Sequence, residues 1–377
     1  MSTIDQMVQD PPGRDDAPQK RSSHSWILVL ALIVALAILA GYVWADKATS
    51  NLSAIAPGEA RTVQGYISVP PDKAHNHHGQ ILLVTVALLT VKPLTWIRDK
   101  LNPDIQLVKT RALTGNSPPS QLNKVNTVEM ENSTQTAVVV ALERLGFKVK
   151  LTEKGAEVTQ VVAKSPADGR LAPGDVIVSI MGTPTPTNQN LVAAIRSHHP
   201  GEQVKLTVEH PGGKQEDETV TLGQSPPDPK VPDTPHAFLG IATATKEQVT
   251  LPMDVKIDPG NIGGPSAGLA FTLGVIDDLT AGDLTGGRTI AVTGTINPDG
   301  TVGDVGGVVQ KTKAVRNAGA VAFLVPPGEY NDAVKHAGSQ LKVIKVTNLE
   351  DALTALRNLG GDLAAIGPPP AAPAAAH

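Results

Sequence analysis

The segment that decides the fold carries two glycine-rich turns, Gly263-Gly264-Pro265-Ser266-Ala267-Gly268 and Gly306-Gly307-Val308-Val309-Gln310-Lys311. The apolar run over 267–279 predicts a buried helix after the first turn, with Pro265 suited to the first helical position. Ser266 would then lie at a helix N-terminus, where free N–H groups and the dipole favour developing negative charge. We interpret Ser266 as a candidate nucleophile. The alternative, which is the commoner use of such a serine, is a helix N-cap.

A second helix is predicted over 308–319, and it places a lysine on its apolar face. At about 100° per residue, Val308 and Val315 share the face of Lys311, whereas Lys313 points the other way. A buried ammonium has a lowered pKa, and a neutral amine can take a proton from a serine hydroxyl. We therefore interpret Lys311 as the base for Ser266. The alternative is a lysine that extends its head to solvent.

The sequence Gly264-x-Ser266-x-Gly268 also fits the nucleophile elbow of α/β-hydrolases. That elbow follows a buried strand, whereas Asp258-Pro259-Gly260-Asn261 precedes this turn. Only His336 and His377 follow the serine as triad candidates, and neither lies in an evident catalytic loop. We therefore reject the elbow.

Three motifs resemble, in order and spacing, the proteolytic domain of Lon proteases: Gly-Pro-Ser-Ala-Gly, Thr293-Gly294-Thr295-Ile296, and Gly-Gly-x-x-x-Lys ending at Lys311. The resemblance implies a Ser266–Lys311 dyad, with Thr293 as a partner of the lysine. It also implies that Gly263, Gly264 and Pro265 form the supporting turn, although many Lon enzymes have aspartate at the position of Gly263.

The chain looks closest to the membrane-anchored, PDZ-containing Lon-like proteins of bacteria, the YlbL-like group. This resemblance implies an α+β fold: an N-terminal transmembrane helix, then a Lon-type proteolytic domain of the ribosomal protein S5 domain 2-like class with an inserted PDZ domain. It also implies a homo-oligomer, because Lon relatives form rings.

The amino-acid composition argues against several classes of function. The chain of 377 residues has a formal net charge of −4, 3% aromatic residues and no cysteine. This argues against a nucleic-acid partner and excludes disulfides, thiolate metal sites and cysteine nucleophiles. The sequence carries no Gly-x-x-x-x-Gly-Lys-Ser/Thr phosphate loop, and we expect no cofactor. A cluster of His75, His77 and His78 lacks further ligands at useful spacing, so a solvated turn is favoured over a metal site.

The N-terminal part predicts attachment to a membrane. Residues 1–25 are polar and are expected to form a disordered cytoplasmic tail. The uncharged run over 26–44, bracketed by Trp26 and Trp44, reaches about 30 Å as a helix, which is enough to cross a bilayer. Basic residues precede it, so the N-terminus is expected in the cytoplasm and the remainder outside. The alternative is a cleaved signal peptide.

Residues 51–145 are predicted to begin the protease domain. They contain a helix over 93–101, with Trp96 and Ile97 pointing inward, and another helix over 132–145. Residues 236–360 complete the domain and carry the dyad. We predict that strands before 128 and strands after 235 share one sheet.

Residues 146–224 resemble a PDZ domain through Ser165-Pro166-Ala167, Gly174-Asp175 and a late helix over 188–197. Leu145-Gly146-Phe147 resembles the loop that grips a peptide carboxylate in such domains. The alternative is a small β-domain that only spaces the protease from the membrane. Residues 225–235 predict a linker and residues 361–377 a disordered Pro/Ala tail.

These features predict a membrane-anchored, ATP-independent serine endopeptidase that cleaves unfolded or membrane-proximal polypeptides. The PDZ domain would bind substrate peptide. A non-catalytic PDZ scaffold at the membrane and a serine esterase remain as alternatives.

Overall fold

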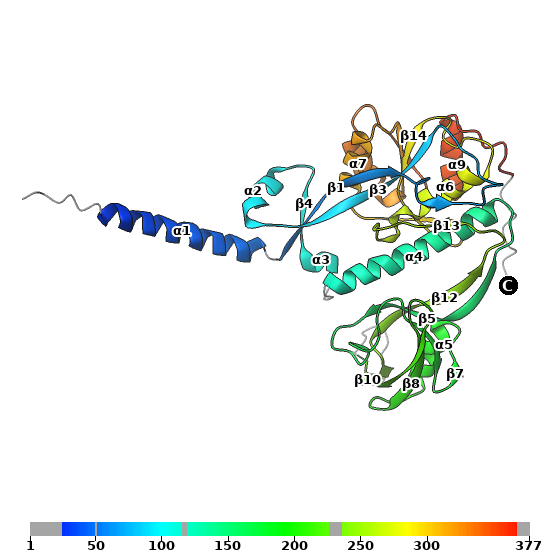
Figure 1. Ribbon diagram of the computed structural model, residues 1–377, viewed down its shortest axis with the longest axis horizontal. Coiled ribbons are helices and arrows are strands. Elements are labelled where there is room, and N and C mark those ends of the chain that lie inside the picture. The colour runs from blue at the N-terminus through cyan, green and yellow to red at the C-terminus, as the bar shows by residue number, and fades with distance from the viewer. Residues whose placement is uncertain (1–24, 50, 115–118, 226–235, 368–377) are drawn as a thin grey trace, which may run out of the picture. The chain divides into compact units, whose positions relative to one another are not determined.

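The computed structural model describes residues 25–49, 51–114, 119–225 and 236–367 (Figure 1). The chain divides into two compact units, residues 1–50 and 51–377. The predicted tail over 1–25 lies outside the described residues except for Ser25. The described part of the first unit is one helix, α1 (Ser25–Thr49).

Helix α1 covers the predicted membrane span over 26–44, and its Trp26 and Trp44 are each 67% exposed. Within the described ranges, no helix meets the length and apolarity that a membrane crossing requires.

A six-stranded mixed sheet forms the centre of the second unit, in the order β18-β17-β14-β3-β1-β4. Its strands are β1 (Leu52–Thr62), β3 (Gln80–Thr90), β4 (Gln106–Lys109), β14 (Thr289–Val292), β17 (Ala322–Val325) and β18 (Lys342–Lys345). Strands β3, β14, β17 and β18 are parallel, whereas β1 is antiparallel to β3 and β4. Strands from before residue 128 and after residue 235 thus share this sheet.

Helices cover both faces of the sheet, which explains the continuous apolar run in β3. Ile81 and Leu83 enter one core with α4 (Pro119–Arg144), α6 (Gly268–Leu279) and α9 (Leu349–Asn358). Leu82 and Val84 enter a second core with α7 (Val308–Asn317) and α8 (Tyr330–Ala337). Because successive strand residues point to opposite faces, the helices that carry the two predicted dyad residues lie in different layers.

Short elements complete this part of the fold. They are α2 (Pro93–Leu101), α3 (Thr110–Thr114), the pair β2 (Ile67–Ser68) and β13 (Lys256–Ile257), the pair β15 (Thr295–Ile296) and β16 (Val302–Gly303), and the 3₁₀ turns η1 (Pro265–Ala267) and η2 (Pro327–Glu329). In α2 the predicted inward position of Ile97 is wrong, since Ile97 is 64% exposed and Asp99 is buried instead.

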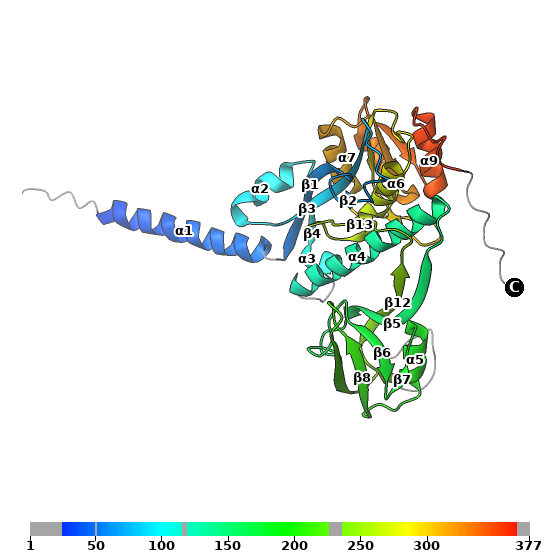
Figure 2. The same ribbon diagram turned by 45° about the vertical axis from the view of Figure 1, so that its right-hand side comes forward.

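The residues between the two halves of the central sheet form a second sheet with its own core, in the order β12-β5-β6-β8-β9 (Figure 2). Its elements are β5 (Lys150–Val161), β6 (Val176–Ile180), β7 (Thr183–Pro184), α5 (Asn188–Arg196), β8 (Gln203–Glu209), β9 (Gln215–Thr221), β12 (Ile241–Thr250) and the pair β10 (Gly223–Gln224) and β11 (Ala237–Phe238). Helix α5 is capped by Thr187, whose hydroxyl accepts the N–H of Asn190.

The start of the predicted C-terminal protease segment belongs to this second sheet. Strand β12 pairs with β5 along its whole length, from Ile241 opposite Val161 to Thr250 opposite Lys150. Strands β5 and β12 form a long antiparallel ribbon, and one end of this ribbon packs in the core of the second sheet. The edge strand of that sheet, β12, therefore comes after the linker in the chain. Residues 226–235 of that linker lie outside the described part.

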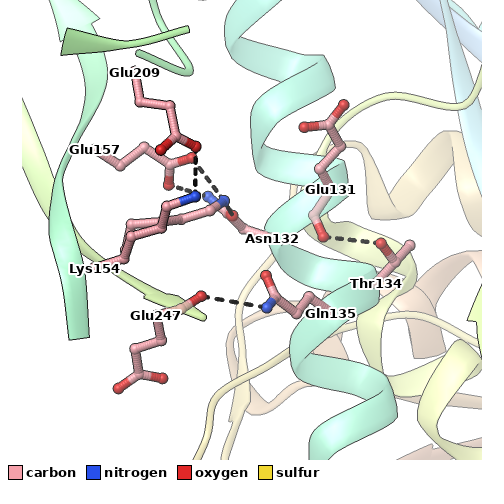
Figure 3. Close-up of polar contacts among 9 residues, drawn as sticks. Glu131, Asn132, Thr134, Gln135, Lys154, Glu157, Glu209 and Glu247 are labelled. Carbon is pink, nitrogen blue, oxygen red and sulfur yellow. Dashed lines mark hydrogen bonds and ion pairs between the residues drawn. The ribbon is translucent and has the colours of Figure 1, made fainter. Parts of the chain in front are cut away.

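The ribbon is joined to helix α4 by a polar cluster (Figure 3). Asn132 of α4 donates from Nδ2 to Glu157 Oε2 at 2.7 Å and accepts at Oδ1 from Lys246 Nζ at 2.8 Å. Lys246 also pairs with Glu157 Oε1 at 2.9 Å. Glu157 is only 3% exposed, and its charge is matched by a cation and an amide. The cluster therefore ties the ribbon to the helix.

Residues 361–367, the first part of the predicted disordered tail, are not as predicted. Leu363 and Ile366 are buried in the core that contains α9. Residues 368–377 lie outside the described part of the chain.

Candidate active site

Two contacts from helix α4 hold the turn before Ser266. Gly264 has φ 83°, a conformation that favours glycine, and its N–H donates to the carbonyl of Asn126 at 2.9 Å. Ser133 Oγ donates to the carbonyl of Pro265 at 3.1 Å. The turn continues through η1 into α6, as the predicted proline start requires. Ser266 therefore lies on a short, doubly supported turn.

Gly268 allows this turn to approach its neighbours closely. A Cβ atom added at Gly268 would lie 2.8 Å from Ser133 Oγ and 3.0 Å from the backbone nitrogen of Ile296. The carbonyl of Ser266 also accepts the N–H of Gly294 at 3.0 Å. Ser266 is half-buried, so its hydroxyl stays reachable from outside.

Lys311 reaches the same place from α7. This helix begins after Gly307, whose φ is 70° and whose Cβ, if added, would lie 2.7 Å from Val86 Cγ1. The Lys311 side chain is 2% exposed, and its Nζ lies 3.0 Å from Ser266 Oγ. The same Nζ lies 3.0 Å from Oγ1 of Thr293, which follows β14 and is fully buried. The structure thus brings together Ser266, Lys311 and Thr293, with Gly263, Gly264 and Pro265 leading into the nucleophile.

Burial changes the proton affinity of the lysine. It lowers the pKa of Lys311 from 10.5 to about 8, and the negative charge of Glu329 opposes that change. A substantial fraction of the amine is therefore neutral in weakly alkaline solution. Glu329 is itself buried, which raises its pKa, and its Oε1 accepts the N–H of Val305 at 2.8 Å.

Sequence reasoning missed Glu329 and Ser133. Both residues lie far from Ser266 in the chain: Glu329 follows β17, and Ser133 lies on α4. Neither has a local motif that could have identified it. A neutral amine beside the hydroxyl of a half-buried serine, at the start of a helix, suits nucleophilic acyl transfer.

The histidine cluster makes ordinary contacts. His77 Nε2 lies 3.0 Å from the carbonyl oxygens of Asp277 and Thr280, and the ring of His75 stacks on that of His77. Within the described ranges, no three or more acid, histidine or cysteine side chains gather so as to hold a metal ion.

The predicted peptide-binding loop, Leu145-Gly146-Phe147, lies elsewhere than expected. It follows the end of α4, and Leu145 and Phe147 pack against the core of the central sheet. The groove of the second sheet lies instead between α5 and the segment 236–243. Leu191, Val192 and Ile195 line one side and Phe238, Leu239 and Gly240 the other, around a cavity volume of about 260 Å³.

The loop Phe238-Leu239-Gly240-Ile241 has the features that the other loop lacks. The carbonyls of Leu239 and Gly240 accept the N–H groups of Ala167 and Val162. Among the residues that the structure describes, the N–H groups of Leu239 and Gly240 themselves have no hydrogen-bond partner. A glycine between apolar residues, just before a predicted strand, is the sequence signal that could have found this loop, and in the structure its φ is 84°.

Two family models match different regions of the chain. Residues 143–222 match the PDZ domain, and residues 241–358 match the Lon protease (S16) C-terminal proteolytic domain. The chain therefore contains a PDZ domain and a proteolytic domain of the serine peptidase type. The strand β12, at the start of the second match, lies in the sheet of the PDZ domain.

Curated relatives of the proteolytic region are Lon proteases. Lon protease 2 of Bacillus subtilis (strain 168) is 32% identical over 103 residues, 26% of this chain and 18% of that protein. The Lon protease of Phenylobacterium zucineum is 31% identical over 120 residues, 31% of this chain and 15% of that protein. The archaeal Lon protease of Halobacterium salinarum is 28% identical over 117 residues, 30% of this chain and 15% of that protein. The chain spans less than a fifth of the length of these relatives.

Solved structures match the other domain. The PDZ domain of an SdrC-like protein from Listeria monocytogenes is 30% identical, covers 25% of this chain and 92% of its own, and has a TM-score of 0.22. A protein from Geobacillus thermodenitrificans is 31% identical, covers 24% of this chain and 97% of its own, and has a TM-score of 0.20.

Proposed function

We propose that this chain is a serine endopeptidase in which Ser266 and Lys311 form the catalytic dyad. The observation that carries the proposal is the 3.0 Å contact between Ser266 Oγ and the Nζ of a lysine that is 2% exposed. A lysine is almost never buried so deeply without a partner or a function. The match of residues 241–358 to a Lon proteolytic domain supports the same reaction class.

In the proposed reaction, the neutral amine of Lys311 accepts the Ser266 hydroxyl proton while Oγ bonds to the peptide carbonyl carbon. Backbone N–H groups at the start of η1 stabilise the resulting oxyanion. The C–N bond then breaks, and the Lys311 ammonium returns its proton to the leaving amine. Water attacks the acyl-enzyme, gives a proton to Lys311 and releases the new carboxyl group, and Ser266 Oγ recovers its proton from the lysine. The Thr293 hydroxyl, 3.0 Å from Nζ, orients the amine throughout.

The proposed substrates are unfolded or loosely folded polypeptides, cleaved without ATP. The sequence contains no phosphate-binding loop of the P-loop type, so the proposal includes no ATP-driven unfolding step. Ser266 is half-buried, and a flexible chain can approach it more easily than a folded surface can.

We also propose that the groove between α5 and β12 binds the C-terminal segment of a substrate. The unpaired N–H groups of Leu239 and Gly240 suit a carboxylate, and β12 is the end strand of its sheet, which suits addition of a peptide strand. Val192 lines the groove and is 40% exposed, so Val192→Glu should weaken binding without disturbing the core. Fluorescence anisotropy with a peptide and its C-terminal amide tests this. Equal affinity for the two peptides contradicts carboxylate recognition.

We also propose that residues 26–44 attach the chain to a membrane, with the proteolytic domain outside the cytoplasm. We further propose that the chain is a member of the YlbL-like group. The support for membrane attachment is the uncharged sequence of that segment and the exposure of its flanking tryptophans. Carbonate-washed membranes should retain the full chain, and protease added outside spheroplasts should digest it. Recovery in the soluble fraction contradicts this part.

A homo-oligomer is proposed from the Lon resemblance alone. Native mass spectrometry tests it, because an oligomer has a multiple of the 39.2 kDa mass of one chain.

A peptide boronate tests the reaction class, because boron forms a reversible bond with an activated serine. We expect a boronate adduct on wild type and none on Ser266→Ala or Lys311→Ala. No adduct on any form indicates a non-catalytic PDZ scaffold. Turnover of a short ester without cleavage of casein indicates an esterase.

A further inference from the structure

Helix α2 presents its apolar side chains outward. Leu94, Ile97 and Leu101 recur at helical spacing, so they share one face. They are 86%, 64% and 77% exposed. Asp99, the only acid of the helix, lies on the opposite side and is 6% exposed. An ordinary surface helix has the reverse arrangement, with its apolar face buried and its charges in water.

Two exposed leucines of β3 lie a few residues before α2 in the chain, on opposite faces of the strand. Leu88 and Leu89, near the end of β3, are 51% and 50% exposed. They lie next to the start of β1 in the sheet, where Leu88 is opposite Ile55 and Leu89 opposite Ala54. Exposed apolar patches of this kind mark surfaces that contact a partner or a lipid.

Exposed cations lie on α2 and near it in the chain. Lys92, Arg98 and Lys100 on and beside α2 are exposed, and Lys109 and Arg111 follow on β4 and α3. Within 87–114 the sequence contains two acids. Asp99 pairs with Arg98, and Asp104 pairs with Lys313 at 3.1 Å. The partner that fits is therefore apolar within and anionic at its surface.

Trp96 lies on the side of α2 away from the apolar face, where its ring is half-buried and the Nζ of Lys100 lies 5.2 Å from the ring centroid. An apolar face flanked by Lys and Arg is the pattern of helices that lie in the plane of a bilayer surface.

We propose that α2 and the end of β3 dock on the surface of an anionic lipid bilayer, with Leu94, Ile97 and Leu101 inserted among the acyl chains. Lys92, Arg98 and Lys100 then contact lipid phosphates. The strands β1, β3 and β4 meet at this end of the sheet, and β1 is the element that follows α1 in the chain. Docking here is independent of catalysis at Ser266.

The absence of cysteine from the sequence allows a single reporter on the full chain. A spin label is placed through Ile97→Cys, or through Val334→Cys as the matched control, since Val334 is an exposed residue of α8 at 46%. Both variants carry Ser266→Ala so that proteolysis cannot cut the sample. Oxygen and a nickel chelate then report whether the label lies in lipid or in water, in vesicles of phosphatidylcholine with or without phosphatidylglycerol.

We expect the label at 97 to become accessible to oxygen and protected from nickel in the anionic vesicles only, while the label at 334 stays in water. Adding Lys92→Gln and Lys100→Gln should lower the docking equilibrium constant about tenfold, because each lysine near an anionic surface contributes to binding. Arg98 is left in place so that its ion pair with Asp99 is intact.

Three results overturn the proposal. A label at 97 that is as exposed to nickel as the label at 334 in both lipids excludes docking. Equal protection in neutral and anionic vesicles excludes recognition of charge. Protection in detergent without lipid, at a mass that is a multiple of the chain, shows instead that the patch joins copies of this protein.

Discussion

The Nζ of Lys311 lies 3.0 Å from Oγ of Ser266, although the two residues are 45 positions apart in the sequence. The contact joins the two helical layers of the central sheet, because α6 and α7 lie in different cores. Thr293 and Glu329 follow the carboxyl ends of the parallel strands β14 and β17. Thr293 contacts the lysine directly, and Glu329 acts on it through its charge. The sheet thus positions two of the groups that act on Lys311, while Ser266 reaches it from η1.

The rate of peptide cleavage should depend on the neutral form of Lys311. Because burial lowers its pKa to about 8, kcat/KM should rise with pH and level off above that value. A pH profile with a fluorogenic peptide measures this. A profile that is flat between pH 6 and 9 contradicts the role of the lysine as base.

The Glu329→Gln variant should shift this profile toward lower pH. The negative charge of Glu329 raises the pKa of Lys311, so its removal lets the amine lose its proton more easily. Glutamine can still accept the N–H of Val305, which keeps the loop before α7 in place. Asp332→Asn removes an exposed acid of α8 as the control and should leave the profile where it is.

The Lys311→Met variant should be inactive and should change how stability depends on pH. In wild type the folded lysine has a pKa near 8 and the unfolded one 10.5, so the unfolded chain binds more protons between these values. Wild-type stability therefore rises between pH 8 and 10.5, by up to about 1.4 kcal/mol per pH unit. Urea unfolding at several pH values should show this rise in wild type and not in Lys311→Met. Parallel curves for the two proteins contradict a lowered pKa.

The Thr293→Val variant should lower kcat about tenfold to a hundredfold, because the lysine amine loses one hydrogen-bonding partner while the buried volume is conserved. Thr293→Ser, which restores the hydroxyl, should recover most of the rate. Steady-state kinetics with one peptide decides between the two. Loss of activity in both variants points to packing at this buried position instead of the hydroxyl.

The cluster of Asn132, Glu157 and Lys246 should couple the PDZ domain to helix α4. A double-mutant cycle with Asn132→Ala and Lys246→Met should give an interaction free energy of about 1–3 kcal/mol, since the two side chains share the buried Glu157. Urea unfolding measures it. The control Gln135→Ala removes only the 3.5 Å contact with the Glu247 carbonyl and should cost little. Additive effects in the cycle show that the cluster does not act as a unit.

Local periodicity was enough to predict the setting of Lys311, because Val308 and Val315 define the buried face of the same helix. The turn at Ser266 likewise carries its own glycines and proline. Residues that act across the fold could not be predicted: Ser133 and Glu329 reach the site from other elements. The spacing in α2 predicts an apolar face but not whether that face is buried or exposed. The predicted inward position of Ile97 was therefore wrong. The PDZ loop at Phe238-Leu239-Gly240-Ile241 was missed because a linker separates it from the rest of its domain.

The central claim is that Ser266, activated by Lys311, cleaves peptide bonds. Peptide mass spectrometry of denatured casein after incubation with wild type, Ser266→Ala and Lys311→Ala tests it most directly. We expect new peptides whose amounts grow with time for wild type and no such peptides for either variant. The same peptides appearing at an equal rate with Ser266→Ala, or none appearing with wild type at pH 8 to 9, would contradict it.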